Sequence, residues 1–248
     1  MGQQRIVITT GDGDCPVEVL APDGAGPWPA VVLFMDAGGI RPALIAMAAR
    51  LAEAGYMVLV PDLFYRFGPY APMVPKELFK GDFRAVIGPM MATTSNQKAA
   101  ADLVPLIDWL AVHPDVRGVR IGGVGYCMGG AMALTAAARY PGHVVAAASF
   151  HGGHLADDSP TSPHLLARDI RAEVYVAGAD ADASYPLQMA ARLQGALADA
   201  GVRNKCEIYP GALHGWTMPD FPVYDHDAAE RAWTELLALL ARNLSPSQ

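Results

Sequence analysis

A cysteine flanked by glycines lies where a predicted strand gives way to a predicted helix. Residues 125–130 read GYCMGG, so Cys127 has a glycine two positions before it and another two positions after it. A nucleophile held on a sharp strand-to-helix turn needs small neighbours there, because larger side chains would collide with the backbone. We therefore predict that Cys127 is a nucleophile, that the N–H of Met128 stabilises an oxyanion, and that the positive helix end favours the thiolate.

A nucleophile of this kind needs a base, and His214 is the candidate. It lies in residues 210–216 (PGALHGW), directly after a predicted strand, at the sheet edge where sites of α/β proteins gather. His151 follows another predicted strand and is a candidate to line the same site. Together with His154 and His164 it lacks the ligand spacing of a metal site, so we predict no metal.

The histidine in turn needs an acid, and two aspartates compete for that role. Asp180 and Asp182 lie in residues 179–186 (ADADASYP), after a predicted strand and between Cys127 and His214 in the chain. Either carboxylate could hold the imidazole in the required tautomer and stabilise the imidazolium. The other would cap the turn or the helix that begins near Pro186. The chemistry of the residues alone leaves both open.

Alternating strands and helices are expected to position these groups. Apolar runs indicate strands, and periods near 3.6 residues indicate helices. Strands are predicted at 5–10, 15–20, 30–35, 56–63, 119–126, 143–150, 172–178 and 204–210, and helices at 42–54, 97–113, 128–140, 187–200 and 225–243. This order predicts one three-layer α/β domain over residues 1–248, with a mostly parallel sheet. The long irregular stretch 64–96 is expected to be a lid or a binding loop.

The composition excludes several other classes of protein. The 248 residues carry 18 basic and 25 acidic side chains, a formal charge of −7, which disfavours nucleic acid as a partner. A hydrophobic content of 52% with 17% charged residues is that of a globular protein. No apolar run is long enough to span a membrane. Three sparse cysteines and a first segment unlike a signal peptide favour a cytoplasmic location.

The chain resembles the dienelactone hydrolase family, a cysteine-nucleophile branch of the α/β-hydrolase fold. The resemblance covers roughly the whole chain and is carried by four segments: residues 60–64 (VPDLF), 125–130 (GYCMGG), 182–186 (DASYP) and 211–215 (GALHG). It implies an α/β-hydrolase-like three-layer sandwich that hydrolyses carboxylic esters or lactones without a cofactor. In the family the acid of the triad stands four residues before a proline, which selects Asp182.

The resemblance also implies a second oxyanion donor. An acidic residue follows the first central strand in the family, beside the amide that completes the oxyanion hole. Asp36 and Ala37 fall at these positions, although the family usually has glutamate where this chain has Asp36.

The substrate side of the site departs from the family. Dienelactone hydrolase itself holds a carboxylate with arginines, one of them four residues after the histidine, and Met218 stands there in this chain. Arg41, Arg66 and Arg84 could supply charge from other loops, although each is expected to be a solvated or structural residue instead. With Trp216 also expected at the rim, we predict a preference for neutral lactones or aryl esters.

The sequence therefore predicts a hydrolase of small-molecule esters or lactones that works through a Cys-His-Asp triad and a thioester acyl-enzyme, as a monomer or a weak homodimer. Neither a metal nor an organic cofactor is expected. One alternative is a small-molecule binding protein on the same fold without turnover. Another is a redox thiol protein in which Cys206 resolves Cys127.

Overall fold

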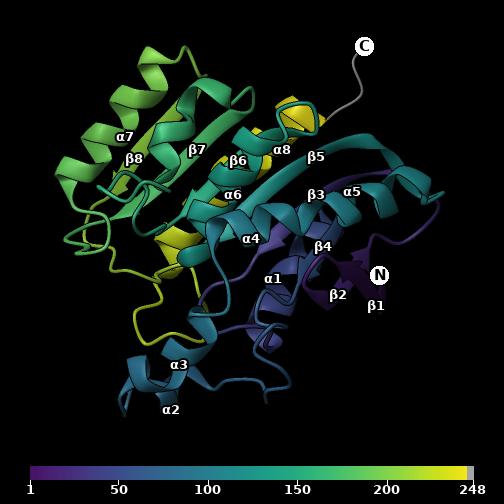
Figure 1. Cartoon of the computed structure of the whole chain (residues 1–248), viewed down its shortest axis with the longest axis horizontal. Coiled ribbons are helices and arrows are strands. Elements are labelled where there is room, and N and C mark those ends of the chain that lie inside the picture. Colours follow the sequence, from purple (N-terminus) through teal and green to yellow (C-terminus); the bar gives the residue numbers. More distant parts are fainter. Residues whose placement is uncertain (245–248) are drawn as a thin grey trace.

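The computed structural model describes residues 1–244, and an eight-stranded sheet runs through the middle of the molecule (Figure 1). Its spatial order is β1-β2-β4-β3-β5-β6-β7-β8. The strands are β1 (Gly2–Thr10), β2 (Gly13–Ala21), β3 (Trp28–Phe34), β4 (Met57–Pro61), β5 (Val116–Tyr126), β6 (Val144–Phe150), β7 (Glu173–Ala179) and β8 (Asn204–Tyr209). The hairpin β1–β2 and the pair β2–β4 are antiparallel, and all other neighbours are parallel.

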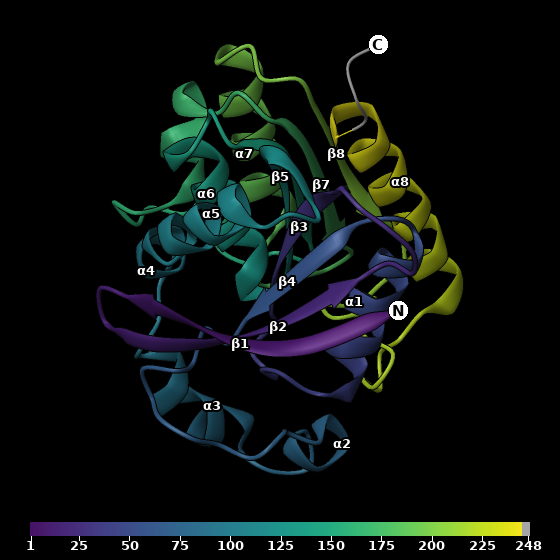
Figure 2. The same ribbon diagram turned by 90° about the vertical axis from the view of Figure 1, so that its right-hand side faces the viewer.

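Helices cover both faces of this sheet. They are α1 (Pro42–Glu53), α2 (Pro75–Leu78), α3 (Phe83–Met91), α4 (Asn96–Ala101), α5 (Leu103–Val112), α6 (Met128–Arg139), the 3₁₀ helix η1 (Pro163–Asp169), α7 (Leu187–Asp199) and α8 (His226–Leu244). Helices α1 and α8 pack on one face, and α4 to α7 pack on the other (Figure 2). The α/β-hydrolase-like sandwich with a mostly parallel sheet that the sequence predicts is confirmed.

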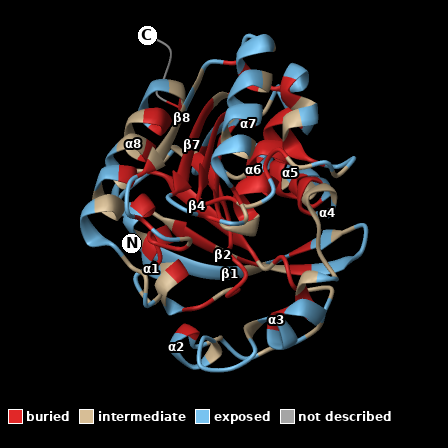
Figure 3. Cartoon of the chain, turned by 90° about the vertical axis from the view of Figure 1, so that its left-hand side faces the viewer, coloured by how far each residue is buried: buried red, intermediate tan, exposed pale blue. Residues whose placement is uncertain are grey.

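The central strands are buried because helices screen both of their faces (Figure 3). Strand β4 is buried along its whole length, and β3 is buried from Ala30 to Phe34. A strand buried on both faces reads as a continuous apolar run, which is why these strands could be identified from sequence. Helix α1 also matches its sequence signals, since Pro42 occupies its first turn and Gly55, with φ of +98°, follows its end.

The structure differs from the sequence prediction in two segments. The stretch 64–96, expected to be irregular, contains the short helices α2 and α3, which lie at one end of the molecule and are mostly exposed (Figure 3). The single helix expected at 97–113 is divided into α4 and α5 at Asp102. Asp102 is buried and receives hydrogen bonds from Arg66 and Tyr65, a long-range contact that periodicity does not reveal.

Candidate active site

The turn between β5 and α6 has the backbone of a strained elbow. Cys127 adopts φ of +52° and ψ of −119°, a region that residues other than glycine rarely occupy. A Cβ atom at Gly125 would collide with the carbonyl oxygen of Gly129, and one at Gly129 would collide with that of Phe34. Glycine at both positions therefore lets the chain place Cys127 at the N-terminus of α6.

A carboxylate and an imidazole meet beside this turn. Nδ1 of His214, in the loop after β8, lies 2.7 Å from Oδ2 of Asp182, in the loop after β7. Oδ1 of the same carboxylate accepts hydrogen bonds from the backbone N–H of Ser184 at 2.8 Å and from its Oγ at 2.7 Å. Burial disfavours the charged carboxylate, but these bonds to His214 and Ser184 outweigh it and lower the pKa of Asp182 to about 2.

The imidazole also contacts the cysteine. Burial disfavours protonation of His214, yet the hydrogen bond to Asp182 and the neighbouring Cys127 overcome this and raise its pKa to about 10. The structure thus brings together Cys127, His214 and Asp182, three residues that the sequence singles out from three separate loops. At neutral pH the imidazole holds a proton between a carboxylate and a sulfur atom.

The competing aspartate has another position. Asp180 is exposed, and its Oδ2 accepts a hydrogen bond of 3.0 Å from the N–H of Gly211. Its own N–H donates to the carbonyl oxygen of Ala212 at 2.8 Å. Asp180 therefore fastens the loop that carries His214, while Asp182 contacts the imidazole itself.

Ser184 is a component of the site that the sequence analysis missed. Besides its two bonds to Asp182, its Oγ lies 3.3 Å from Nδ1 of His214. A serine two residues after an aspartate is a known signature of a turn in which the carboxylate accepts the backbone N–H at that position. That spacing could have identified Ser184 as a partner of Asp182.

Two backbone N–H groups lie at the positions expected for an oxyanion hole. Met128 is the first residue of α6, where N–H groups have no acceptor within the helix, and Ala37 follows β3. Within residues 1–244, neither N–H donates a backbone hydrogen bond. Both are therefore available to a ligand.

Asp36, expected beside the second oxyanion amide, is part of a buried ion cluster with Arg41 and Asp220. Arg41 donates to both oxygens of Asp36 at 2.8 and 2.9 Å and to both oxygens of Asp220 at 2.7 and 3.1 Å. The N–H of Gly38 donates to Asp36 as well, at 2.5 Å. The cluster ties the loop after β3 to the loop that follows His214.

The arginines proposed to hold a substrate carboxylate do not gather at the site. The guanidinium of Arg41 is fully buried and occupied by two carboxylates. Arg66 makes a bidentate pair with Asp102 at 2.7 and 3.0 Å and bonds to Asp12. Arg84 is exposed on α3. Because the guanidinium groups of Arg41 and Arg66 are already bonded to aspartates, neither is free for a substrate carboxylate.

Trp216 and Met218 do not form an open rim either, since both are completely buried. The Trp216 ring stacks on Tyr209 at 5.0 Å, which draws it into the interior. His151 is also buried, so it does not line an open cavity. Its Nε2 lies 2.7 Å from Oγ1 of Thr217, and its ring packs edge-on against His214 at 5.2 Å. Burial and the neighbouring His214 keep the pKa of His151 well below its usual value.

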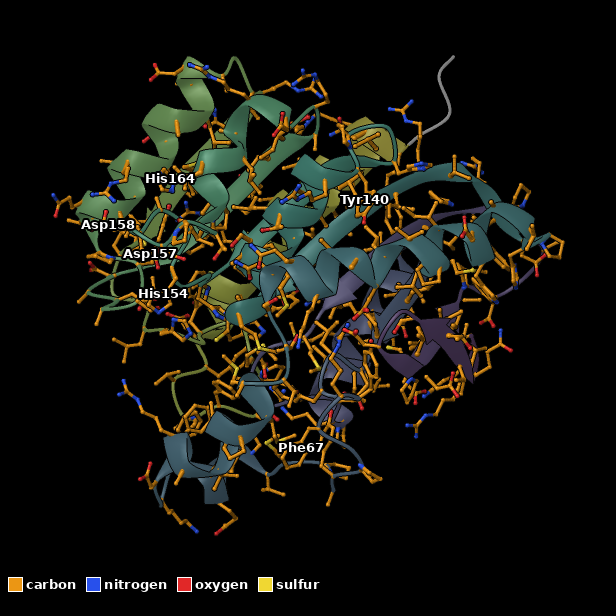
Figure 4. The ribbon with its side chains drawn as sticks, viewed as in Figure 1. Phe67, Tyr140, His154, Asp157, Asp158 and His164 are labelled. Carbon is orange, nitrogen blue, oxygen red and sulfur yellow. The ribbon has the colours of Figure 1, made fainter. Side chains whose placement is uncertain are left out.

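His154, in the loop after β6, and His164, in η1, lie near Asp157 and Asp158 at the outer edge of the molecule (Figure 4), and the backbone N–H of His154 donates to the carbonyl oxygen of Ser184 at 2.8 Å. His154 is exposed and its Nδ1 lies 3.2 Å from Asp157. Among the residues that the structure describes, no group of three or more potential ligand side chains is arranged to hold a metal ion. Within residues 1–244, no helix is both long enough and apolar enough to cross a membrane.

The fold is that of an α/β hydrolase, and a cysteine occupies the turn between β5 and α6. The dienelactone hydrolase family, compared as a sequence model, matches residues 16–244, and the chain belongs to this family. It is therefore a hydrolase.

Relatives with known names agree with this assignment. A protein of Escherichia coli O157:H7 named "Putative carboxymethylenebutenolidase" is 28% identical over 192 residues, covering 76% of this chain and 67% of the relative. A protein of the same name from Methylorubrum extorquens is 24% identical and covers 94% and 78%. The crystal structure of a "Putative Dienelactone Hydrolase" from Klebsiella pneumoniae superposes with a TM-score of 0.86, at 25% identity, over 97% of this chain and 98% of that one.

Proposed function

We propose that this protein hydrolyses small neutral carboxylic esters or lactones through a thioester formed on Cys127. One observation carries the proposal: Asp182 is hydrogen-bonded to His214, and that imidazole lies close enough to Cys127, on the strained turn at the start of α6, for the cysteine to raise its pKa. Such an arrangement supplies a nucleophile, a proton carrier and a group that orients it.

In the first half of the reaction, Sγ of Cys127 attacks the carbonyl carbon of the substrate. The N–H groups of Ala37 and Met128 stabilise the negative charge that develops on the carbonyl oxygen. The C–O bond then breaks, and His214 donates its proton to the departing alcohol oxygen. The product of this half is the thioester and a free alcohol, or a tethered alcohol when the substrate is a lactone.

In the second half, water attacks the thioester carbonyl. His214 accepts a proton from that water, the same two amides stabilise the second oxyanion, and the C–S bond breaks. The carboxylic acid leaves, and the sulfur and imidazole share the proton as before. Asp182 keeps Nδ1 of His214 protonated in both halves, so that Nε2 carries the moving proton.

The substrate is expected to be neutral. A substrate carboxylate that loses its hydration in the site must be paired, and the forks of Arg41 and Arg66 are already bonded to aspartates. Met218, at the position of the family's arginine, is buried and uncharged. A carboxylated lactone is therefore expected to react with a lower kcat/KM than its neutral analogue.

The test is hydrolysis of p-nitrophenyl acetate and a neutral lactone by the wild-type chain and by Cys127→Ala. We expect a burst of one p-nitrophenol per chain, an acetyl group on Cys127 by mass spectrometry, and loss of both in Cys127→Ala. Cys206→Ala is the matched control and should keep the burst, because Cys206 lies in β8 and bonds to Asn204.

Full turnover by Cys127→Ala would contradict the covalent mechanism. Binding of esters without a burst in the wild type would support the alternative of a binding protein. A disulfide between Cys127 and Cys206 under mild oxidation, with no burst, would support the redox alternative.

A further inference from the structure

A pocket of about 190 Å³ is lined by residues of α1 and α8 and by Tyr126 and Phe150, at the ends of β5 and β6. Helices α1 and α8 cover one face of the sheet, and α6 covers the opposite face (Figure 2). Cys127, Asp182 and His214 are not among its lining residues, so the proposed reaction does not use it. An engineered cavity of about 150 Å³ in another protein holds a benzene molecule, which sets the scale for one aromatic ring.

The floor and walls of the pocket favour a flat, apolar occupant. The rings of Tyr126 and Phe150 form a stacked pair, with centroids 5.2 Å apart and an angle of 20° between their planes. The walls include the small side chains of Ala46 on α1 and of Ala229 and Ala232 on α8, which leave the space open. Aromatic rings pack favourably on such surfaces.

The hydroxyl of Tyr126, which lines the pocket, has no hydrogen-bond partner in the part of the protein that the structure describes. Tyr126 is only 2% exposed, yet its hydroxyl forms no hydrogen bond with any residue in 1–244. Burial raises the pKa of Tyr126, so the hydroxyl stays protonated and can donate. A hydroxyl that lacks a protein partner is free to bond to an occupant, and tyrosine hydroxyls usually find a partner. An occupant with an oxygen atom would supply it.

The charges near the pocket are already neutralised. Arg50 forms a bidentate ion pair with Glu230, and its guanidinium lies 4.3 Å from the ring centroid of Trp233. A charged ligand would have to compete with this pair, whereas a neutral ligand would not.

We propose that this pocket binds a neutral compound of one aromatic ring with one hydroxyl group, of the phenol class. The ring lies against Tyr126 and Phe150, between α1 and α8, and its oxygen accepts the hydrogen bond of the Tyr126 hydroxyl. This assignment is independent of the proposed ester hydrolysis.

The test is calorimetric titration of the full-length protein with phenol, toluene, cyclohexanol and benzoate at one pH. We expect saturable 1:1 binding of phenol. Toluene, which lacks the oxygen, should bind about 2- to 13-fold more weakly, the range of one net hydrogen bond. Cyclohexanol and benzoate should bind more weakly still, because one lacks a flat ring and the other carries a charge.

Three variants locate the binding. Ala229→Leu fills the pocket from its wall and should abolish phenol binding. Ala198→Leu makes the same change on an exposed position of α7 and should leave it intact. Tyr126→Phe should reduce the affinity for phenol to that for toluene and leave toluene unchanged.

Several results would overturn the proposal: no saturable binding of phenol, equal binding by Ala229→Leu, or an unchanged preference for phenol over toluene in Tyr126→Phe. Phenol binding should also raise the Tm of the wild type but not that of Ala229→Leu. The Tm of each variant without ligand shows whether the substitution itself has altered folding. All readouts measure binding, so failure here is distinct from failure of the proposed hydrolysis.

Discussion

Two regions at the same edge of the sheet each pair a buried carboxylate with a cationic side chain, and the two pairs differ in whether the cation can release a proton. Asp182 is paired with His214, whose side chain is 32% exposed and can exchange its proton. Asp36 is paired with Arg41, which is completely buried, also bonded to Asp220, and does not titrate. The first region can therefore move a proton, whereas the second can only hold two loops in place.

Removal of the charge on Asp182 should have the largest effect. We expect Asp182→Asn to lower kcat by about 10⁴-fold, the loss seen when the corresponding acid of a serine triad is replaced. The reason is that an amide does not hold Nδ1 protonated or stabilise the imidazolium. The measurement is kcat for p-nitrophenyl acetate, at saturating substrate.

The matched control is Asp180→Asn, which alters the neighbouring carboxylate that bonds to Gly211 instead of to the imidazole. Its kcat should fall by less than about tenfold, which corresponds to 1.4 kcal/mol. Equal losses in the two variants would show that both carboxylates serve the reaction mainly through the loop.

Loss of the Arg41 ion pairs should lower the stability of the fold. Arg41→Met leaves Asp36 buried without its cation, and loss of one partner of a buried ion pair destabilises proteins by about 3–5 kcal/mol. The free energy of unfolding by urea measures this. Arg50→Met, which breaks the half-exposed pair with Glu230, is the control and should lose about 0–1 kcal/mol.

A second substitution tests whether the unpaired charge on Asp36 causes this loss. Asp36→Asn combined with Arg41→Met removes the unpaired buried charge at Asp36 and should recover part of the lost stability. If Arg41→Met alone is no less stable than Arg50→Met, the cluster does not hold the loops as inferred.

The pH dependence separates the two regions directly. Because the pKa of His214 is raised to about 10, hydrolysis should decline as the pH rises through about 10, where the imidazole loses the proton that the leaving group needs. The hydrogen bond to Asp182 contributes to this raised pKa, so Asp182→Asn should move the decline to lower pH. Asp36→Asn should leave it in place. A profile of kcat/KM between pH 6 and 11 tests both statements, and a shared shift would contradict them.

The same shift has a consequence for stability. A histidine with a raised pKa contributes stability that is fully present below its unfolded value of 6.5 and is lost as the pH rises toward about 10. Between pH 6.5 and about 10, the unfolding free energy of the wild type should therefore fall more than that of Asp182→Asn, in which the pKa of His214 is raised less. Parallel curves for the two proteins would exclude a contribution from this pair.

The smallest effect is expected at the contact behind the imidazole. Thr217→Val removes the hydroxyl that bonds to Nε2 of the buried His151 and should destabilise the fold by about 1–3 kcal/mol, the range for an orphaned buried polar group. Thr234→Val, at an exposed position of α8, is the matched control and should be close to neutral. Equal stability of the two variants would show that His151 finds another partner.

Much of this protein is determined by local sequence. The order of strands and helices follows from apolar runs and helical periods, and the elbow follows from Gly125 and Gly129, because backbone sterics act over a few residues. The positions of Cys127 and His214 after predicted strands indicate that both lie at one edge of the sheet. The resemblance to a family then favoured Asp182 over its neighbour.

Tertiary structure decided which side chains meet. The sequence leaves the partner of Arg41 open, and the structure places its guanidinium on Asp220, 179 residues away in the chain. Trp216 is expected at a rim from the sequence, but packing on Tyr209 buries it. The contact of His151 with Thr217 also joins separate loops. Such partnerships depend on distances between segments that are remote in sequence, and neither residue type nor spacing along the chain specifies those distances.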